Sequence, residues 1–138
     1  MASIEREVEN ALLNAISAVT GVNFYTSERG TARTLPNVVA KASIGSEELG
    51  PFTGVFTTPA SLIYTARADT ISRTEFDAKF QSIMGQLYRS PDLASYMTSN
   101  SNITCFLSNV TAESPSVIKT NRTWSKEITL DIKACAKL

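Results

Sequence analysis

The segment TWSKEITLDIKACA, residues 123–136, alternates apolar and polar residues along almost its whole length. Successive side chains of a β-strand point to opposite faces, so this alternation predicts a long strand with one buried face. We expect Trp124, Ile128, Leu130, Ile132 and Ala134 to point inward, and Ser125, Glu127, Thr129, Asp131 and Lys133 to point outward. The outward set raises the question of what this polar face contacts.

A helix is predicted near the start of the chain. Apolar residues recur there at steps of three and four, with Ser3 as the N-cap and Gly21 as the stop signal. The apolar stripe consists of Ile4, Val8, Ala11, Leu12, Ala15, Ile16 and Val19. Glu5, Glu9 and Asn14 fall on the opposite, polar side. The pattern is typical of an amphipathic helix that covers an apolar surface.

Further strands are predicted at 22–26, 37–44, 61–69 and 102–111, where β-branched and aromatic residues gather. Pro36 lies where a strand can spare a backbone donor. In the third of these strands Leu62, Tyr64, Ala66 and Ala68 share one side. The polar stretch 27–34 indicates a loop. The stretch 45–60 holds three Gly and two Pro in 16 residues, so we expect no long regular structure there.

A second helix is predicted after residue 73. Thr74 followed by Asp77 resembles a capping box. Phe76, Phe80, Ile83, Met84 and Leu87 form its apolar stripe, and this spacing is more typical of a core face than of a ligand site. Pro91 and Asp92 are expected to end the helix and to begin a single turn that reaches Met97.

The order of elements is helix, three strands, helix, two strands, with no strand–helix–strand alternation. It predicts one α+β domain over residues 1–138, with an antiparallel or mixed sheet of about five strands and two main helices on one face.

Composition narrows the classes of function. The chain is 43% hydrophobic and 19% charged, which is typical of a folded domain. Thirteen Lys plus Arg balance thirteen Asp plus Glu, so no global positive field favours nucleic-acid binding. No apolar stretch approaches the ~20 residues of a membrane span, and the first residues are too charged for a secretory signal. We therefore expect a cytoplasmic chain that does not contact a membrane.

No catalytic constellation is evident in the sequence. The chain has no His, so His-based triads and Cys/His zinc sites are excluded, and we expect no metal and no cofactor. Cys105 and Cys135 are expected to be reduced and buried. The adjacent acids Glu47 and Glu48 lie in a Gly/Pro-rich loop and are more typical of solvated charge than of a catalytic dyad. An enzyme that uses carboxylates remains a minor alternative.

Two loops instead suggest contacts with a partner. Arg29, Arg33 and Lys41 lie in or near one loop, where they could meet a phosphate or an acidic partner, or remain solvated. The stretch from Leu49 to Phe56 is unusually apolar for a solvated loop. A sheet with helices on one face also leaves a second face and two edges, and exposed edges invite pairing with another chain.

The early helix, the segment VNFYTSERG…LPNVVAKAS, the apolar Gly/Pro-rich loop, the helix after RADT and the long closing strand occur in a recognisable order. In this order and in length the chain resembles the small tail-terminator or tail-completion proteins of tailed bacteriophages. The resemblance implies a single α+β domain that forms a ring, typically of six copies, in the virion tail or neck after assembly in the host cytoplasm.

The resemblance also implies partners and contact regions. The partners would be copies of the chain, the tail tube protein and the head–tail connector, while DNA passes through without specific binding. The contact regions would be Gly45 to Pro59 and Ala112 to Arg122. The residues singled out for interfaces are Arg29, Arg33, Glu47, Glu48, Leu49, Phe52, Val55, Phe56, Val117, Ile118, Lys119 and Arg122. The alternatives are a head-closure protein, a baseplate adaptor, or a small cytoplasmic module that binds peptide or nucleic acid.

Overall fold

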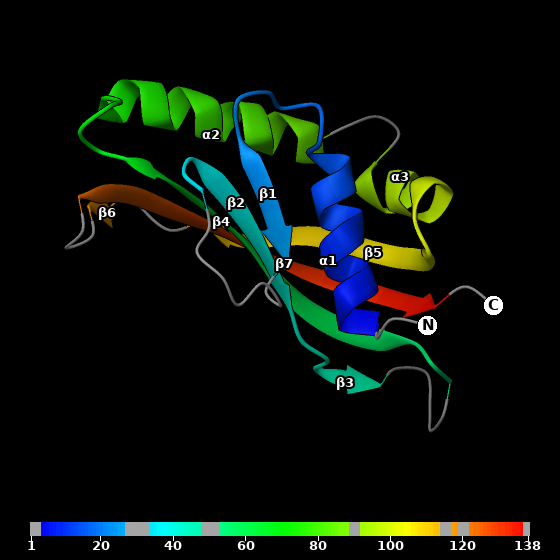
Figure 1. Ribbon diagram of the computed structural model, residues 1–138. Coiled ribbons are helices and arrows are strands. Elements are labelled where there is room, and N and C mark those ends of the chain that lie inside the picture. Colours follow the sequence, from blue (N-terminus) through cyan, green and yellow to red (C-terminus); the bar gives the residue numbers. More distant parts are fainter. Residues whose placement is uncertain are drawn as a thin grey trace.

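The computed structural model describes residues 4–26, 34–47, 53–88, 92–113, 117–118 and 122–136. Over these residues the chain forms three helices and a mixed β-sheet, so the predicted α+β class is confirmed (Figure 1). The elements are α1 (Ile4–Ala15), β1 (Asn23–Thr26), β2 (Asn37–Ala42), β3 (Ser46–Glu47), β4 (Phe56–Arg67), α2 (Arg73–Leu87), α3 (Leu93–Asn100), β5 (Ile103–Glu113), β6 (Val117–Ile118) and β7 (Thr123–Ala136).

The sheet has a main path in the order β1-β2-β4-β7-β5. The two-residue strand β3 adds to β4, and β6 adds to β7, which makes seven strands in the described part of the chain. The expected count of about five was too low, because the two short strands lie in stretches interpreted as connections. β1 runs parallel to β2 and all other pairs are antiparallel, so the sheet is mixed.

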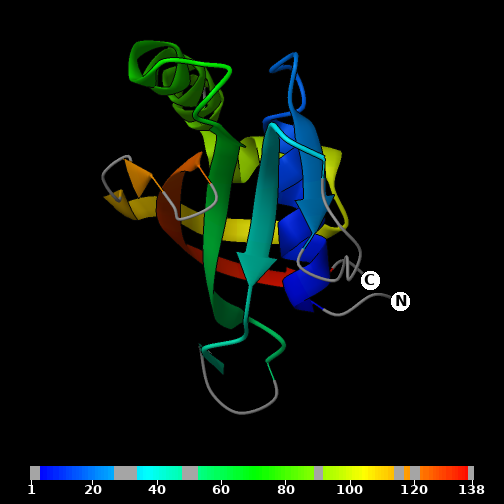
Figure 2. The same ribbon diagram turned by 60° about the vertical axis from the view of Figure 1, so that its left-hand side comes forward.

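All three helices pack on one face of the sheet, as Figures 1 and 2 show. Alternate residues of β4 and β7 point into this helical layer: Ala60, Leu62, Tyr64 and Ala66 from β4, and Ile128, Leu130, Ile132 and Ala134 from β7. Each of these side chains is at most 4% exposed. The third helix was not expected: α3 is capped by Asp92 and extends to Asn100, beyond the predicted single turn.

The predicted inward face of residues 123–136 is confirmed. Ile128, Leu130, Ile132 and Ala134 are 0–1% exposed, and Trp124 packs against the core while half-buried. Lys126 also points to the helical side. Its ammonium lies 3.0 Å from Glu113 and 4.5 Å from the ring centroid of Phe80. The aliphatic stem can therefore cover apolar surface while the charged end is paired.

The predicted apolar residues of both helices pack in or against the core, but α1 ends at Ala15, before the predicted stop at Gly21, and one polar assignment is wrong. Glu9 was placed on the solvent side of α1, and it is only 2% exposed. Its carboxylate accepts a hydrogen bond from the backbone N–H of Ala42 at 3.0 Å. Ala42 is the last residue of β2, so the buried carboxylate satisfies a donor at the end of that strand.

The Gly/Pro-rich stretch 45–60 contains more strand than expected. β4 begins at Phe56 and runs through Pro59. The carbonyl of Pro59 accepts a hydrogen bond from the N–H of Ser43, so the nitrogen of Pro59 also faces the side of β2. The pairing of β2 with β4 ends at Ala42 and Ala60, so no backbone donor is needed at Pro59. Gly45 permits the close approach there: a Cβ on Gly45 would lie 2.9 Å from the carbonyl oxygen of Thr57. This side of the strand can therefore accommodate a proline.

The start of α2 also differs from the prediction. The N-cap is Ser72, and its hydroxyl accepts from the N–H of Glu75 at 3.2 Å in a full capping box. Thr74 is instead inside the first turn. Asp77 forms an exposed ion pair with Arg73 at 3.6 Å. The N-cap therefore lies two residues earlier than expected, and the helix begins at Arg73.

Candidate interaction surfaces

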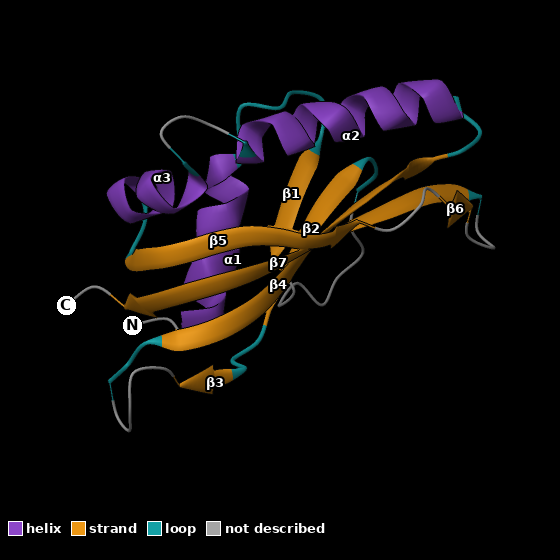
Figure 3. Cartoon of the chain, turned by 180° about the vertical axis from the view of Figure 1, so that it is seen from behind, coloured by secondary structure: helices purple, strands orange, loops and turns teal. Residues whose placement is uncertain are grey.

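The sheet face opposite the helices carries the first candidate surface. We call this side, formed by Val39, Lys41, Ser61, Ile63, Glu127 and Thr129, the open face; none of the three helices of the described segments covers it (Figure 3). The strand register places Ser61 beside both Lys41 and Thr129, and Ile63 beside both Val39 and Glu127. The open face therefore presents a charged or hydroxyl side chain on each of its three strands.

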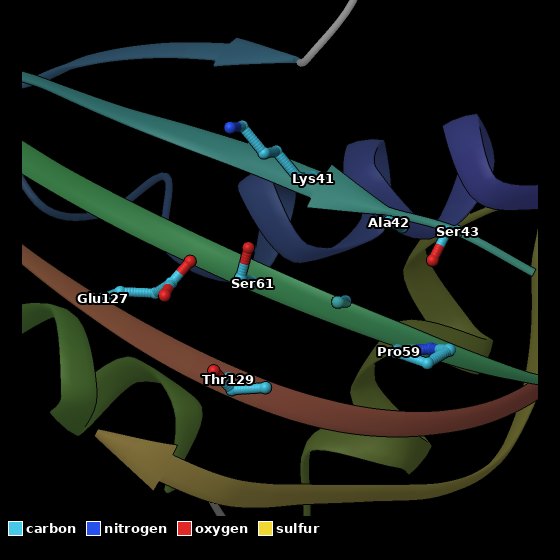
Figure 4. Close-up of a pocket in the computed structure, with 8 residues that line it drawn as sticks. Lys41, Ala42, Ser43, Pro59, Ser61, Glu127 and Thr129 are labelled. Atoms are coloured by element: carbon cyan, nitrogen blue, oxygen red, sulfur yellow. The ribbon is translucent and has the colours of Figure 1, made fainter. Parts of the chain in front are cut away.

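A shallow hollow of about 290 Å³ lies on the open face (Figure 4). It is lined by Lys41, Ala42, Ser43, Pro59, Ala60, Ser61, Glu127 and Thr129. One cation, one acid and three hydroxyl groups can form hydrogen bonds there. A polar face is the usual condition of an antiparallel sheet covered on one side only, and it also suits a polar protein contact.

A larger cavity of about 430 Å³ opens between the first turns of α2, the end of β4 and the turn at Gly21; we call it the α2 cleft. Leu35, Pro36, Tyr64, Ala66 and Ile71 give it an apolar lining. Arg67, Thr70, Glu75 and Lys79 supply its polar groups. The cleft is thus apolar with a charged rim.

Tyr64 contributes an aromatic ring to the lining of the α2 cleft, and it belongs to a cluster of three rings. The rings of Tyr64 and Phe76 are stacked with centroids 4.6 Å apart and planes at 9°, and Trp124 lies 6.1 Å from Phe76. Tyr64 is 3% exposed, and burial raises the pKa of its hydroxyl to about 12. The hydroxyl therefore stays neutral at physiological pH and can donate or accept a hydrogen bond.

The charged rim of the cleft is mostly paired within the chain. Glu75 is occupied by the capping box, and Arg67 lies 3.7 Å from Asp69. Lys79 differs, because its ammonium donates to the backbone carbonyl of Thr20 at 2.9 Å and forms no ion pair with a described residue. Among the described residues of this rim, Lys79 is the cation that has no ion-pair partner.

A third, smaller cavity of about 150 Å³ lies between the end of α2, the start of α3 and strand β5. Tyr88, Asp92 and Ser108 contribute its polar groups. Hydrogen bonds from Ser95 lower the pKa of the Asp92 carboxyl, so Asp92 is ionised at neutral pH. The buried hydroxyl of Ser108 has no hydrogen-bond partner among the described residues.

Three large apolar side chains of the described segments are exposed: Ile44 at 46%, Tyr88 at 68% and Phe106 at 59%. Phe106 sits on the edge strand β5, where the pairing with β7 skips from Cys105 to Leu107. Such a bulge bends the strand and redirects the extra side chain. Phe106 is therefore the unpaired residue of a bulge on an edge strand, with its side chain exposed.

Half of the residues predicted for interfaces lie outside the described residues: Arg29, Arg33, Glu48, Leu49, Phe52 and Lys119. The grouping of Lys41 with the two arginines is therefore also outside what the structure describes. Lys41 itself lies on the open face of β2 and is exposed.

The other predicted interface residues fall at two opposite ends of the β4–β7 ladder. At one end Glu47 is paired with Phe56, which also pairs with Ala134. At the other end Ile118 of β6 pairs with Trp124 of β7, and the carbonyl of Arg122 accepts a hydrogen bond from the N–H of Ala68 at 2.8 Å. The structure therefore brings together residues within each predicted region and separates the two regions.

Sequence reasoning missed Phe106 and the α2 cleft. One signal was available for Phe106: in the stretch ITCFLS the alternation puts Phe106 on the side of Thr104 and Ser108, where a polar residue is expected. The cleft could not be read from the sequence, because it is formed by segments that meet only in the folded chain.

No three Cys, Asp or Glu side chains of the described segments gather closely enough to hold an ion. Cys105 and Cys135 are free thiols, with Cys105 buried as predicted and Cys135 only half-buried. No described helix combines the length and apolarity needed to cross a bilayer.

No protein-family model and no curated protein matches the sequence. The functional argument therefore rests on the geometry of these surfaces.

Proposed function

We propose that the chain is a structural subunit of a bacteriophage virion. Copies of it would close into a ring, of six subunits by the resemblance, at the head-proximal end of the tail. The ring would stop polymerisation of the tail tube and offer a joining surface to the head–tail connector.

The observation that carries the proposal is the one-sided construction of the sheet. The helices and the core occupy one face, and the open face is left polar and hollowed. The sheet path also ends in two dissimilar edges: the four-residue parallel strand β1 and the eleven-residue bulged strand β5. A ring needs two different surfaces per subunit that fit each other head to tail, and two dissimilar edges supply such surfaces.

The proposal assigns termination to shape. The head-side surface of the ring would not repeat the bonding surface of the tube, so no further tube subunit could add. Each ring subunit would be held by two neighbours, which strengthens weak individual contacts. The balanced charge of 13 cations and 13 acids suits a channel that DNA crosses without sticking.

One experiment tests this function directly. Tail tube protein would be polymerised with and without the purified chain and examined by negative-stain electron microscopy. We expect rings of the chain alone, and tubes that stop growing with a ring at one end. Tubes that grow to the same length and carry no added density would overturn the proposal.

A matched pair of variants sharpens that experiment. Ser61→Arg places a bulky charge in the hollow of the open face, and Ser82→Arg places the same group on an exposed position of α2. Both variants should remain folded. We expect Ser61→Arg to impair ring formation or tube capping and Ser82→Arg to leave both intact. Equal behaviour of the two variants would remove the open face from the contact.

The α2 cleft favours a second candidate function, a small binding module. Its volume of about 430 Å³ lies in the range of roughly 300–1,000 Å³ that is common for ligand sites. A binding module would be a stable monomer in solution and would retain a small ligand with the cleft residues protected. Rings that form without any ligand would instead favour the structural role.

A further inference from the structure

We propose that Phe106 of one copy inserts into the α2 cleft of the next copy, so that each ring contact joins the edge of strand β5 to the cleft. This inference deepens the proposed function and rests on the chain forming a ring.

Phe106 has the properties of an inserted side chain. It is 59% exposed, whereas the preceding residue of the same strand, Cys105, is buried. The bulge between Cys105 and Leu107 directs Phe106 away from the regular ladder with β7. A bulge on an edge strand also discourages continuous pairing with a second strand, so a side-chain contact suits this edge better than extension of the sheet.

The α2 cleft has one aromatic ring in its lining. Tyr64 lines the cleft and is stacked on the fully buried Phe76, and a further phenyl ring can approach Tyr64 edge-on or offset. Tyr64 lines the cleft and is only 3% exposed. Its hydroxyl forms no hydrogen bond to a described residue. A backbone group of the strand that carries Phe106 would give this hydroxyl a partner.

The charges beside the two surfaces are also complementary. Asp92 lines the third cavity together with Ser108 and Val110 of β5, so its ionised carboxylate lies close to the strand that carries Phe106. Asp92 forms no ion pair with a described residue, and neither does Lys79 at the cleft. Docking would bring Asp92 of one copy towards Lys79 of the next. This charge complementarity favours the proposed orientation of the two copies over others.

The two surfaces lie at opposite corners of the subunit. Cys105 pairs with Ala134, while Ala66 at the cleft pairs with Trp124, ten residues earlier along β7. At about 3.3 Å per residue this is a separation on the order of 30 Å. Two different surfaces placed so far apart generate a head-to-tail contact, which either closes into a ring or continues as a filament.

The other exposed apolar side chains suit the cleft less well. Tyr88 follows α2, the helix that itself forms one wall of the cleft, and it borders the third cavity instead. Ile44 has no ring to place against Tyr64. Phe106 is therefore the occupant that matches the cleft in chemistry and position.

Four variants test the contact by mass photometry and size-exclusion chromatography with light scattering. Phe106→Ala removes the inserted ring, and Thr70→Trp fills the cleft from an exposed lining position. Tyr88→Ala and Thr74→Trp are the matched controls at exposed positions outside the cleft. We expect Phe106→Ala and Thr70→Trp to be monomers with unchanged circular dichroism, and both controls to form the same rings as the original chain.

Mixing the two defective variants gives a sharper result. The Phe106→Ala subunit keeps an intact cleft, and the Thr70→Trp subunit keeps Phe106, so one contact can form and the second cannot. We expect a 1:1 dimer and no ring. A mixture that remains monomeric overturns the proposal, as do rings formed by either variant alone or an original chain that stays monomeric.

The outcomes separate this contact from the proposed function. Rings that cap tail tubes but tolerate both Phe106→Ala and Thr70→Trp overturn the contact and leave the function standing. Rings that depend on Phe106 and the cleft but never bind a tail tube keep the contact and remove the tail function.

Discussion

The same two strands, β4 and β7, present very different faces to the two sides of the sheet. Towards the helices Leu62, Ile128 and Leu130 are at most 1% exposed, and apolar packing determines their identity. On the open face Ser61, Glu127 and Thr129 are half-buried and polar. The comparison teaches that apolar burial explains most of the helix-covered face, while the open face is free to be shaped by contacts outside the monomer.

The largest expected effect breaks the helix-covered face. Leu130→Asp would place a charge where the side chain is 1% exposed, at a cost of several kcal/mol, comparable with a total domain stability of about 5–15 kcal/mol. We expect an unfolded or insoluble chain. Thr129→Asp, one residue along on the open face, should stay folded with a loss of less than about 1 kcal/mol. Urea unfolding followed by circular dichroism measures both, and similar losses would contradict the assignment of the faces.

A smaller effect is expected from the buried acid that connects α1 to β2. Glu9→Ala leaves the N–H of Ala42 without its acceptor, which should lower the free energy of unfolding by about 1–3 kcal/mol. Asn10→Ala, at the exposed neighbouring position, should change it by less than about 0.5 kcal/mol. Thermal and urea unfolding can compare the two variants. A neutral Glu9→Ala would show that Ala42 finds another partner.

The cap of α2 offers a still smaller and well-controlled test. Ser72→Ala removes the hydroxyl that accepts from Glu75 and should cost about 0.5–2 kcal/mol. Thr74→Ala removes the hydroxyl that the sequence pattern favoured as the cap, and it should cost less than about 0.5 kcal/mol. If Thr74→Ala proves the more damaging substitution, the helix begins where the sequence predicted and not at Arg73.

The two thiols distinguish the two faces with little effect on stability. Burial raises the pKa of Cys105 to about 11, so its thiol is protonated and protected at pH 8. Cys135 is half-buried on the other side of the sheet. We expect a thiol-specific chromogenic reagent to label Cys135 first and Cys105 only when the chain unfolds. Faster labelling of Cys105 would contradict its inward orientation.

The same pKa gives a pH dependence with a defined sign. The folded-state pKa of Cys105 is raised above its ordinary value of 9.0 to about 11, so the thiol's contribution to stability is complete below pH 9 and is lost as the pH rises through 11. The free energy of unfolding should fall between pH 8 and pH 11, and this fall should be smaller for Cys105→Ala than for the original chain. Cys135→Ala is the control and should behave as the original chain does.

The spacing of apolar residues along the chain correctly predicted which faces of the strands and helices are buried. The inward face of residues 123–136 and the stripe of α2 follow from steps of two and of three or four residues. Glu9 could not be assigned in this way, because its burial depends on where a distant strand ends. The strand through Pro59 was missed for a similar reason, since a proline is tolerated only where the neighbouring strand has stopped.

The candidate surfaces were less predictable than the fold. Two overlapping patterns, Ser72 with Glu75 and Thr74 with Asp77, each resemble a capping box, and only the path of the chain out of β4 selects the first. The alternation along residues 103–108 indicates the outward side of Phe106, but no local pattern specifies the bulge that leaves it unpaired with β7. The α2 cleft requires Leu35 and Pro36, which precede β2, to meet the end of β4 and the start of α2, so it exists only in the tertiary structure.

Native mass spectrometry of the purified chain over a range of concentrations tests the central claim most directly, namely that the open face and the two dissimilar edges serve copies of the same chain. We predict one closed oligomer of defined subunit number that replaces the 15.0 kDa monomer as concentration rises. A chain that remains monomeric throughout that range would contradict the account.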